Sequence, residues 1–163
     1  MPFSVSYLLN WLEGSYVADQ IRQSLWLYPA LEIIHITGIT VLVGAAFMFD
    51  LRLLGHSKSL SVSGLSRHLL PWSRRGLWLI VPSGILLFST NAKALGDDVT
   101  FWLKMALLLA AGFNVLIFHR FIYPKFQDDS SGKGRIPRAA KISALVSILL
   151  WIAIISCGRL LAY

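Results

Sequence analysis

Long apolar stretches with few charges constrain the fold of this chain more than any other feature of the sequence. Four of them approach the roughly 20 residues that a helix needs to cross about 30 Å of hydrocarbon. They cover residues 29–54, 71–90, 99–123 and 141–162. Apolar residues make up 56% of the 163 positions and charged residues only 14%, too few to cover such a core in water. The sequence therefore predicts a single-domain, all-α integral membrane protein built as a four-helix bundle.

The lysines and arginines are distributed unevenly along the chain. Eleven of the 15 lie in or beside the connections after the first and third predicted spans, including the polar loop at 129–137. By the positive-inside rule both connections are cytoplasmic, so we expect both termini on the non-cytoplasmic side of the membrane. The net charge of the chain is +7, and its basic residues lie mainly beside the apolar spans, where they set the membrane topology. The lipid bilayer, and not nucleic acid, is therefore the expected partner.

The segment before the first span, residues 4–27, has an amphipathic pattern that Gly14 is expected to interrupt. Its apolar face is predicted to comprise Leu8, Leu9, Trp11, Leu12, Tyr16, Ile21, Leu25 and Trp26. A helix of this kind lies in the membrane interface, with Trp and Tyr at headgroup depth. We expect it to cover the outer end of the first span.

An ionisable side chain at membrane depth is a functional hypothesis by default, because its burial in hydrocarbon is expensive. His35 is the first candidate, about 9 Å into its helix at 1.5 Å per residue. A neutral imidazole can be an axial ligand of haem iron. Glu32, one turn earlier, can orient the ring, and Gly38, one turn later, can let a flat macrocycle approach. The alternative is a buried histidine that hydrogen-bonds to a neighbouring helix.

Lys104 is predicted at the same depth as His35, a few residues into the third span. It can snorkel to the interface. Alternatively, it can pair with Glu32, contact a haem propionate or ligate the iron. Cys157 and Met105 are at a similar depth and suggest copper together with His35, although a lone cysteine on an apolar helix more often serves packing.

A second group of candidates is predicted near the cytoplasmic face. His119 lies about 22 Å from Lys104 along the third span, so it cannot share a metal with His35. His56 and His68 are expected at a depth similar to that of His119, and these three can form a second cofactor site, although interfacial histidines are common. Arg74 and Arg75 lie slightly deeper and can hold haem propionates or phospholipid headgroups, or simply anchor the topology.

Three runs carry a family resemblance over nearly the whole chain. They are LYPALEIIHITGITVLVGAAFMFDLRLLG (27–55), LPWSRRGLWLIVPSGILLF and FWLKMALLLAAGFNVLIFHR. They resemble an uncharacterised family of bacterial four-span membrane proteins, which implies a bacterial inner membrane with both termini on its periplasmic side. More remotely, they are similar to the haem-binding four-helix membrane proteins, namely the bacterial membrane-type protoporphyrinogen oxidase and the copper-resistance D proteins.

In that oxidase group, the positions that match His35 and Lys104 are implicated in haem binding and activity, although the lysine here is more closely spaced. The resemblance implies a b-type haem with His35 as the metal ligand. The expected role is electron transfer between a membrane quinone and a periplasmic redox protein, or a haem-bearing anchor subunit in a homo- or hetero-oligomer. A porphyrinogen-type oxidase, and a non-catalytic scaffold or transport subunit for copper or a small solute, are the alternatives.

Overall fold

The computed structural model describes residues 3–57, 59–124 and 136–161, and all regular secondary structure in these ranges is helical. This confirms the all-α class. The helices are α1 (Phe3–Glu13), α2 (Tyr16–Gln23), α3 (Leu27–Leu54), α4 (Val62–Thr90), α5 (Ala92–Asp97), α6 (Val99–Ile117), the π-helical turn η1 (Phe118–Ile122) and α8 (Arg138–Leu160). Much of the polar loop predicted at 129–137 lies outside the described residues.

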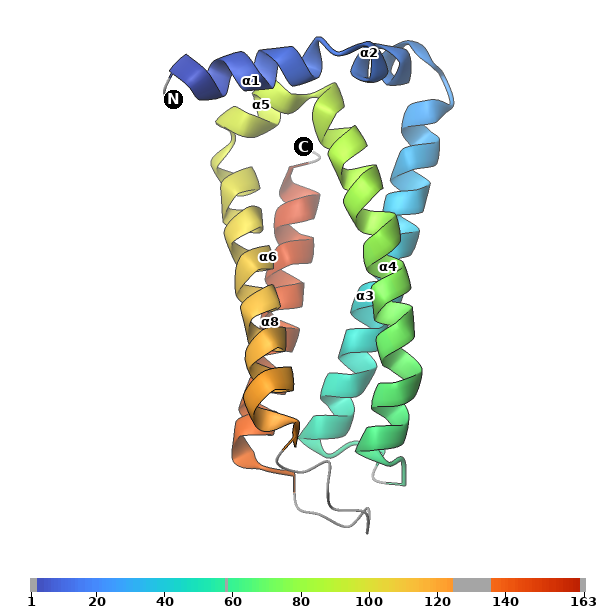
Figure 1. Ribbon diagram of the computed structural model, residues 1–163, viewed down its shortest axis with the longest axis vertical. Helices are drawn as coiled ribbons and strands as arrows, with labels where there is room; N and C mark the ends of the chain where they lie inside the picture. Colours follow the sequence, from blue (N-terminus) through green and yellow to red (C-terminus); the bar gives the residue numbers. More distant parts are fainter. Residues whose placement is uncertain (1–2, 58, 125–135, 162–163) are drawn as a thin grey trace.

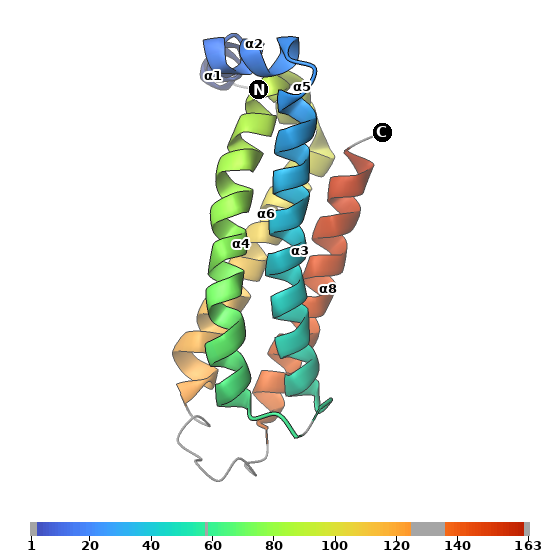
Figure 2. The same cartoon turned by 90° about the vertical axis from the view of Figure 1, so that its right-hand side faces the viewer.

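The long helices α3, α4, α6 and α8 run side by side (Figure 1 and Figure 2). They pack as two pairs, α3 with α4 and α6 with α8, and the pairs meet mainly through α3 and α8. Among the described residues the backbones of α4 and α6 rarely approach each other closely, and the stacked rings of Phe88 and Phe101 join the two helices toward the capped end, with ring centroids 5.1 Å apart. The backbones are therefore closer on the α3–α8 side of the bundle than on the α4–α6 side.

Three helices in the described ranges are long and apolar enough to cross a membrane: Leu27–Leu54, Val99–Ile122 and Arg138–Leu160. The helix α4 is equally long, but serines and basic residues lower the hydropathy of its first half. The predicted span of residues 71–90 lies within α4. The helix itself begins earlier, at Val62, where the Ser61 side chain caps it by accepting a hydrogen bond of 3.1 Å from the Gly64 N–H.

One end of the bundle is covered by α1, α2 and α5, which lie across the ends of the long helices (Figure 1). We call this the capped end. Leu9 of α1 packs against Gly96 of α5, where an added Cβ would overlap its side chain. The Arg22 guanidinium of α2 donates a hydrogen bond of 3.1 Å to the Thr90 carbonyl at the end of α4. The N-terminal segment is thus attached to the bundle by specific contacts.

The predicted break at Gly14 is found, since α1 ends at Glu13 and α2 begins at Tyr16. The apolar side chains of this segment do not share one environment. Leu9 and Ile21 are buried against the bundle, whereas Trp11, Leu25 and Trp26 are more than 60% exposed. The segment therefore presents apolar side chains both to the bundle and to its surroundings.

The contact between α3 and α4 depends on two facing glycines. A Cβ on Gly38 would lie 2.8 Å from Cγ1 of Ile80 and 3.0 Å from the carbonyl oxygen of Gly76. A Cβ on Gly76 would lie 2.9 Å from the carbonyl oxygen of Gly38. The two backbones approach each other so closely that a residue larger than glycine does not fit at either position. The space beside Gly38 that a macrocycle would need is therefore occupied by α4.

Candidate functional site

His35 projects from α3 toward α4, where Ser83 and Gly84 receive it. Its Nδ1 lies 2.9 Å from Oγ of Ser83. Because the Ser83 hydroxyl donates its own hydrogen to the Leu79 carbonyl, its oxygen accepts from Nδ1–H of His35. Gly84 leaves room for the ring, since a Cβ there would lie 3.0 Å from Cε1 of His35. This contact fixes the ring and the Nδ1–H tautomer, and leaves the Nε2 lone pair unused by Ser83.

Lys104 of α6 reaches into the same level of the bundle. Its ammonium lies close enough to the His35 ring and to the Cys157 thiol for electrostatic interaction. Its Nζ also lies 3.8 Å from the position of a Cβ on Gly158 in α8. Lys104 is half-buried, and no ion pair joins it to Glu32 in the described part of the chain. The side chain therefore extends toward α8 and α3.

Each of the four long helices thus contributes one side chain to a polar level near the capped end. We call it the His35 layer, and it consists of His35, Ser83, Lys104 and Cys157. Ser83 and Cys157 are buried, with 3% and 6% of their surfaces exposed. Sequence reasoning identified His35 and Lys104 but missed Ser83, because nothing in the sequence distinguishes this serine from others in apolar helices.

Three other predicted members of this site do not join the His35 layer. Glu32 is exposed, and no described contact connects it to the His35 ring. Gly38 is buried against α4, so it serves helix packing. Met105 is 39% exposed on α6. The layer therefore offers one imidazole, one ammonium, one hydroxyl and one thiol.

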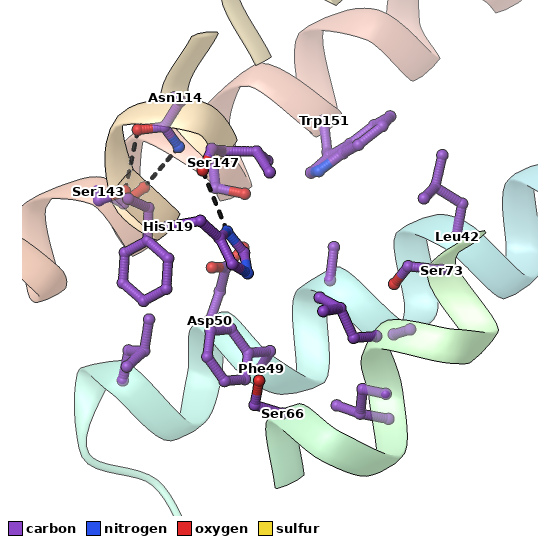
Figure 3. A pocket seen from close by; sticks show the side chains of 17 residues that line it. Leu42, Phe49, Asp50, Ser66, Ser73, Asn114, His119, Ser143, Ser147 and Trp151 are labelled. Atoms are coloured by element: carbon purple, nitrogen blue, oxygen red, sulfur yellow. Dashed lines mark hydrogen bonds between the residues drawn. The ribbon is translucent and has the colours of Figure 1, made fainter. Parts of the chain in front are cut away.

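A cavity of about 150 Å³ lies nearer the opposite end of the bundle, between all four long helices (Figure 3). Asp50 of α3 and His119 of η1 point into it, beside the aromatic rings of Phe49, Phe118 and Trp151. Asp50 is only 7% exposed. One carboxyl oxygen of Asp50 and the Nε2 of His119 are buried without a hydrogen-bond partner among the described residues.

The ring of His119 is oriented by its own helix. Its Nδ1 lies 3.1 Å from the carbonyl oxygen of Val115, and because a carbonyl can only accept, Nδ1 carries the hydrogen. The π-helical turn that begins at Phe118 alters the direction of the residues that follow, and such turns are frequent at functional sites. A neutral His119 therefore presents an acceptor, Nε2, to the cavity.

The remaining predicted residues do not join this cavity. His68 is exposed on α4 and does not line it, so the structure does not bring His68 and His119 together. Arg74 and Arg75 are exposed on α4, where the Arg75 guanidinium lies 4.7 Å from the centre of the Trp72 ring. Sequence reasoning missed Asp50, although a carboxylate inside an apolar span was a signal that could have identified it.

The described residues contain no cluster of three or more His, Cys, Asp and Glu side chains that could hold a metal ion. A site built only from protein ligands is therefore not found in these ranges. A haem brings four ligands of its own and needs only one from the protein. The Nε2 of His35, which the Ser83 contact does not use, is of the atom type that requirement calls for, and the Lys104 ammonium fits the anionic propionates.

An all-helical chain with three helices able to cross a membrane, and with polar side chains gathered between its helices, has the character of a helical membrane protein. Within this class the chain belongs to a family described as "Family of unknown function (DUF6644)", whose sequence model matches residues 8–163. This confirms the predicted membership in a family without assigned function. A search of curated proteins and a search of solved structures each gave no significant match.

Proposed function

We propose that this protein crosses a bacterial inner membrane four times and binds a b-type haem near the periplasmic side through His35. Its role is electron transfer between a membrane quinone and a periplasmic redox protein, directly or as a haem-bearing anchor subunit. The single observation that carries the haem proposal is the Ser83 contact, which holds the Nδ1–H of His35 and does not use Nε2.

Helix lengths support four crossings. A hydrocarbon layer of about 30 Å corresponds to about 20 residues of helix. Counted from the capped end, such a layer covers residues 29–49, 70–90, 99–119 and 141–160. Arg74 and Arg75 are then one turn inside the layer on α4. Because helical side chains lean toward the helix N-terminus, both guanidinium groups can reach the cytoplasmic headgroups.

The surface of the bundle also supports a lipid environment. Large apolar side chains are exposed along all four long helices, among them Ile33, Ile85, Leu109 and Leu149 with 58–65% of their surfaces accessible. In water these side chains would form a large adhesive surface, whereas in a bilayer they face hydrocarbon.

Cysteine labelling tests this topology. In a Cys157→Ser background, single cysteines at Ser59 and at Gly132 are expected to resist a membrane-impermeant maleimide in intact cells and to react after lysis. A cysteine at Asp97, exposed at the capped end, is expected to react in intact cells once the outer membrane is permeabilised. Reaction of Ser59→Cys and Gly132→Cys from outside would contradict the proposed orientation.

The chain's own residues have distinct parts in the proposed site. His35 would hold the iron through Nε2, and Ser83 would keep the ring in place, as partners of metal-bound histidines commonly do. Lys104 would bind a propionate, which would offset the cost of an ammonium at this depth. When bound, the haem would supply a one-electron carrier within reach of the periplasmic side.

The helices at the capped end have a role in the same proposal. In this arrangement α1 and α2 lie in the periplasmic interface, with Trp11 and Trp26 at headgroup depth. Because they cover the end of the bundle above the His35 layer, they would restrict the access of water to it. Solvent access is one of the factors that set a haem potential.

The absorption spectrum of the protein, purified from haem-replete cells in mild detergent, tests the haem proposal. The proposal predicts a Soret band and, after reduction, an α-band typical of b-type cytochromes, at about one haem per chain. A colourless protein that is folded and helical would contradict it.

A further inference from the structure

The cavity between Asp50 and His119 has no part in the haem site, and its polar atoms define what it can hold. Among the described residues, a carboxyl oxygen of Asp50 and Nε2 of His119 are the buried side-chain atoms without a hydrogen-bond partner. With Nδ1–H donated to Val115, Nε2 of a neutral His119 is an acceptor. An Asp50 in its ionised form also only accepts. In these protonation states, a ligand that satisfies both atoms brings two hydrogen-bond donors.

Several other polar groups line the cavity, and Asn114, Ser143 and Ser147 among them have partners of their own, whereas Ser66, Ser73 and the Trp151 indole complete the polar lining. Asn114 and Ser143 are bonded to each other, since the Ser143 hydroxyl donates to Oδ1 of Asn114 at 3.0 Å, and Nδ2 of Asn114 donates to the Ser143 carbonyl at 3.0 Å. Ser147 lies beside the Asp50 carboxyl and can donate to one of its oxygens. The second Asp50 oxygen remains without a donor.

The size and lining of the cavity indicate the body of the ligand. A volume of about 150 Å³ is that of an apolar protein cavity known to accept one benzene molecule. Rings of Phe49, Phe118 and Trp151 line it, together with several leucines. Aromatic walls favour a flat aromatic guest. A six-membered ring with two hydroxyl groups combines this body with the two donors required.

The position of the cavity indicates how such a ligand arrives. Its lining includes residues of both α4 and α6, such as Ser73 and Val115, and the backbones of these two helices rarely approach each other closely. The stacked rings of Phe88 and Phe101, which join the two helices, belong to their ends at the capped end. In the proposed orientation the cavity is near the cytoplasmic edge of the hydrocarbon layer, where the headgroup of a membrane quinol resides. A quinol would enter from the lipid between α4 and α6.

We propose that this cavity binds the hydroquinone headgroup of a membrane quinol, with one hydroxyl donating to Asp50 and the other to His119. The inference extends the proposed exchange of electrons with a quinone, but its test requires no haem. A preparation that lacks haem and binds hydroquinone would refute only the haem site. A haem-loaded protein that binds no hydroquinone would refute only this inference.

Anaerobic equilibrium binding of radiolabelled methylhydroquinone to the protein in nanodiscs tests the inference. We expect saturable binding to the wild type, at one site per chain above the partition into empty nanodiscs. Asp50→Leu and His119→Phe roughly keep the size of the side chain and remove a charged or a neutral acceptor. Each is expected to weaken binding about tenfold, the effect of losing one good hydrogen bond.

The matched control is His56→Phe, which makes the same replacement at an exposed histidine that does not line the cavity. Its affinity for methylhydroquinone should equal that of the wild type. A second comparison needs no variant: 1,4-dimethoxybenzene has a similar shape without donors and should bind at least tenfold more weakly than methylhydroquinone. Equal binding of the two compounds, no saturable binding, or displacement of methylhydroquinone by methylammonium at equal concentration would each overturn the inference.

Discussion

The two histidine sites of this bundle share one design and differ in the charge beside them. In each, Nδ1 is held by an acceptor, the Ser83 hydroxyl for His35 and the Val115 carbonyl for His119. In each, Nε2 is thereby left as an acceptor. The neighbour of His35 is the Lys104 ammonium, whereas the charged group that shares the cavity with His119 is the Asp50 carboxyl.

This difference in the neighbouring charge predicts ligands of different chemistry at the two histidine sites. A free imidazole beside an ammonium suits an electron-pair acceptor that carries anionic groups, as a haem with its propionates does. A free imidazole beside a carboxylate suits a ligand that donates two hydrogen bonds. The choice of ligand therefore depends on the residue opposite the histidine, since the orientation of the ring is similarly fixed at both sites.

The largest expected effect concerns the packing that connects the two regions. Gly38→Ala places a methyl group 2.8 Å from the Ile80 side chain and 3.0 Å from the Gly76 carbonyl oxygen, and the backbone cannot easily yield. We expect the free energy of unfolding to fall by about 1–3 kcal/mol, as overpacking usually costs. Thermal unfolding in detergent, followed by circular dichroism, measures the change.

Gly44→Ala on the same helix is the matched control, because a Cβ there has no neighbour within 4 Å. It should leave the unfolding midpoint unchanged or slightly raised, since alanine favours a helix. If the two variants were equally stable, the close approach of α3 and α4 would be refuted. The packing of α3 on α4, on which both histidine sites depend, would then be wrong.

A smaller effect is expected from Ser83→Ala. This variant removes the acceptor of the His35 Nδ1–H and leaves His35, the proposed iron ligand, in place. Loss of a partner of this kind commonly lowers metal affinity at least tenfold, so we expect about a tenfold weaker affinity for haem. Haem titration of the apoprotein measures it, and the reduction potential should change with it.

The control for this variant is Ser156→Ala, which removes an exposed hydroxyl that donates to the Ile152 carbonyl in the same i−4 pattern. Haem affinity and potential should match those of the wild type. An unchanged affinity and potential in Ser83→Ala would show that the tautomer of His35 is not set by this contact. The two histidine sites would then no longer share an Nδ1–H that is held by an acceptor.

The smallest effect is expected from deletion of residues 2–24, which removes α1 and α2 from the capped end. The bundle should still insert and bind haem, because the residues of the His35 layer all remain. We expect faster reaction of the reduced protein with carbon monoxide and a shifted reduction potential, since water would reach the site more easily. The cavity at the other end should bind methylhydroquinone as before. An unchanged spectrum, potential and carbon monoxide reactivity would show that these helices do not cover the site.

Depth along a helix is the part of this arrangement that the sequence predicts well. A fixed rise of 1.5 Å per residue is enough to place His35 and Lys104 at one level, and the structure brings their side chains within electrostatic range. The same reasoning separates His119 from both. The all-helical class likewise follows from composition and from the length of the apolar stretches.

The direction of each side chain is harder to predict, because it depends on how the helices are rotated and paired. Gly38 illustrates this, since a glycine in an apolar helix can admit either a cofactor or a second helix. Only the facing Gly76 shows that the second helix is present. Asp50 lies four residues before the end of α3, where a carboxylate on its own does not reveal whether it faces solvent or the interior. The π-helical turn that orients His119 has no recognised sequence signal.

The most direct test of the central claim compares the two histidines under identical conditions. His35→Ala and His119→Phe are purified from haem-replete cells, and the ratio of haem to protein is measured for those fractions that match the wild type in helicity and elution volume. We predict that His35→Ala carries no haem and that His119→Phe carries as much as the wild type. Full haem content in His35→Ala, or equal loss in both variants, would contradict the assignment of haem to the capped end.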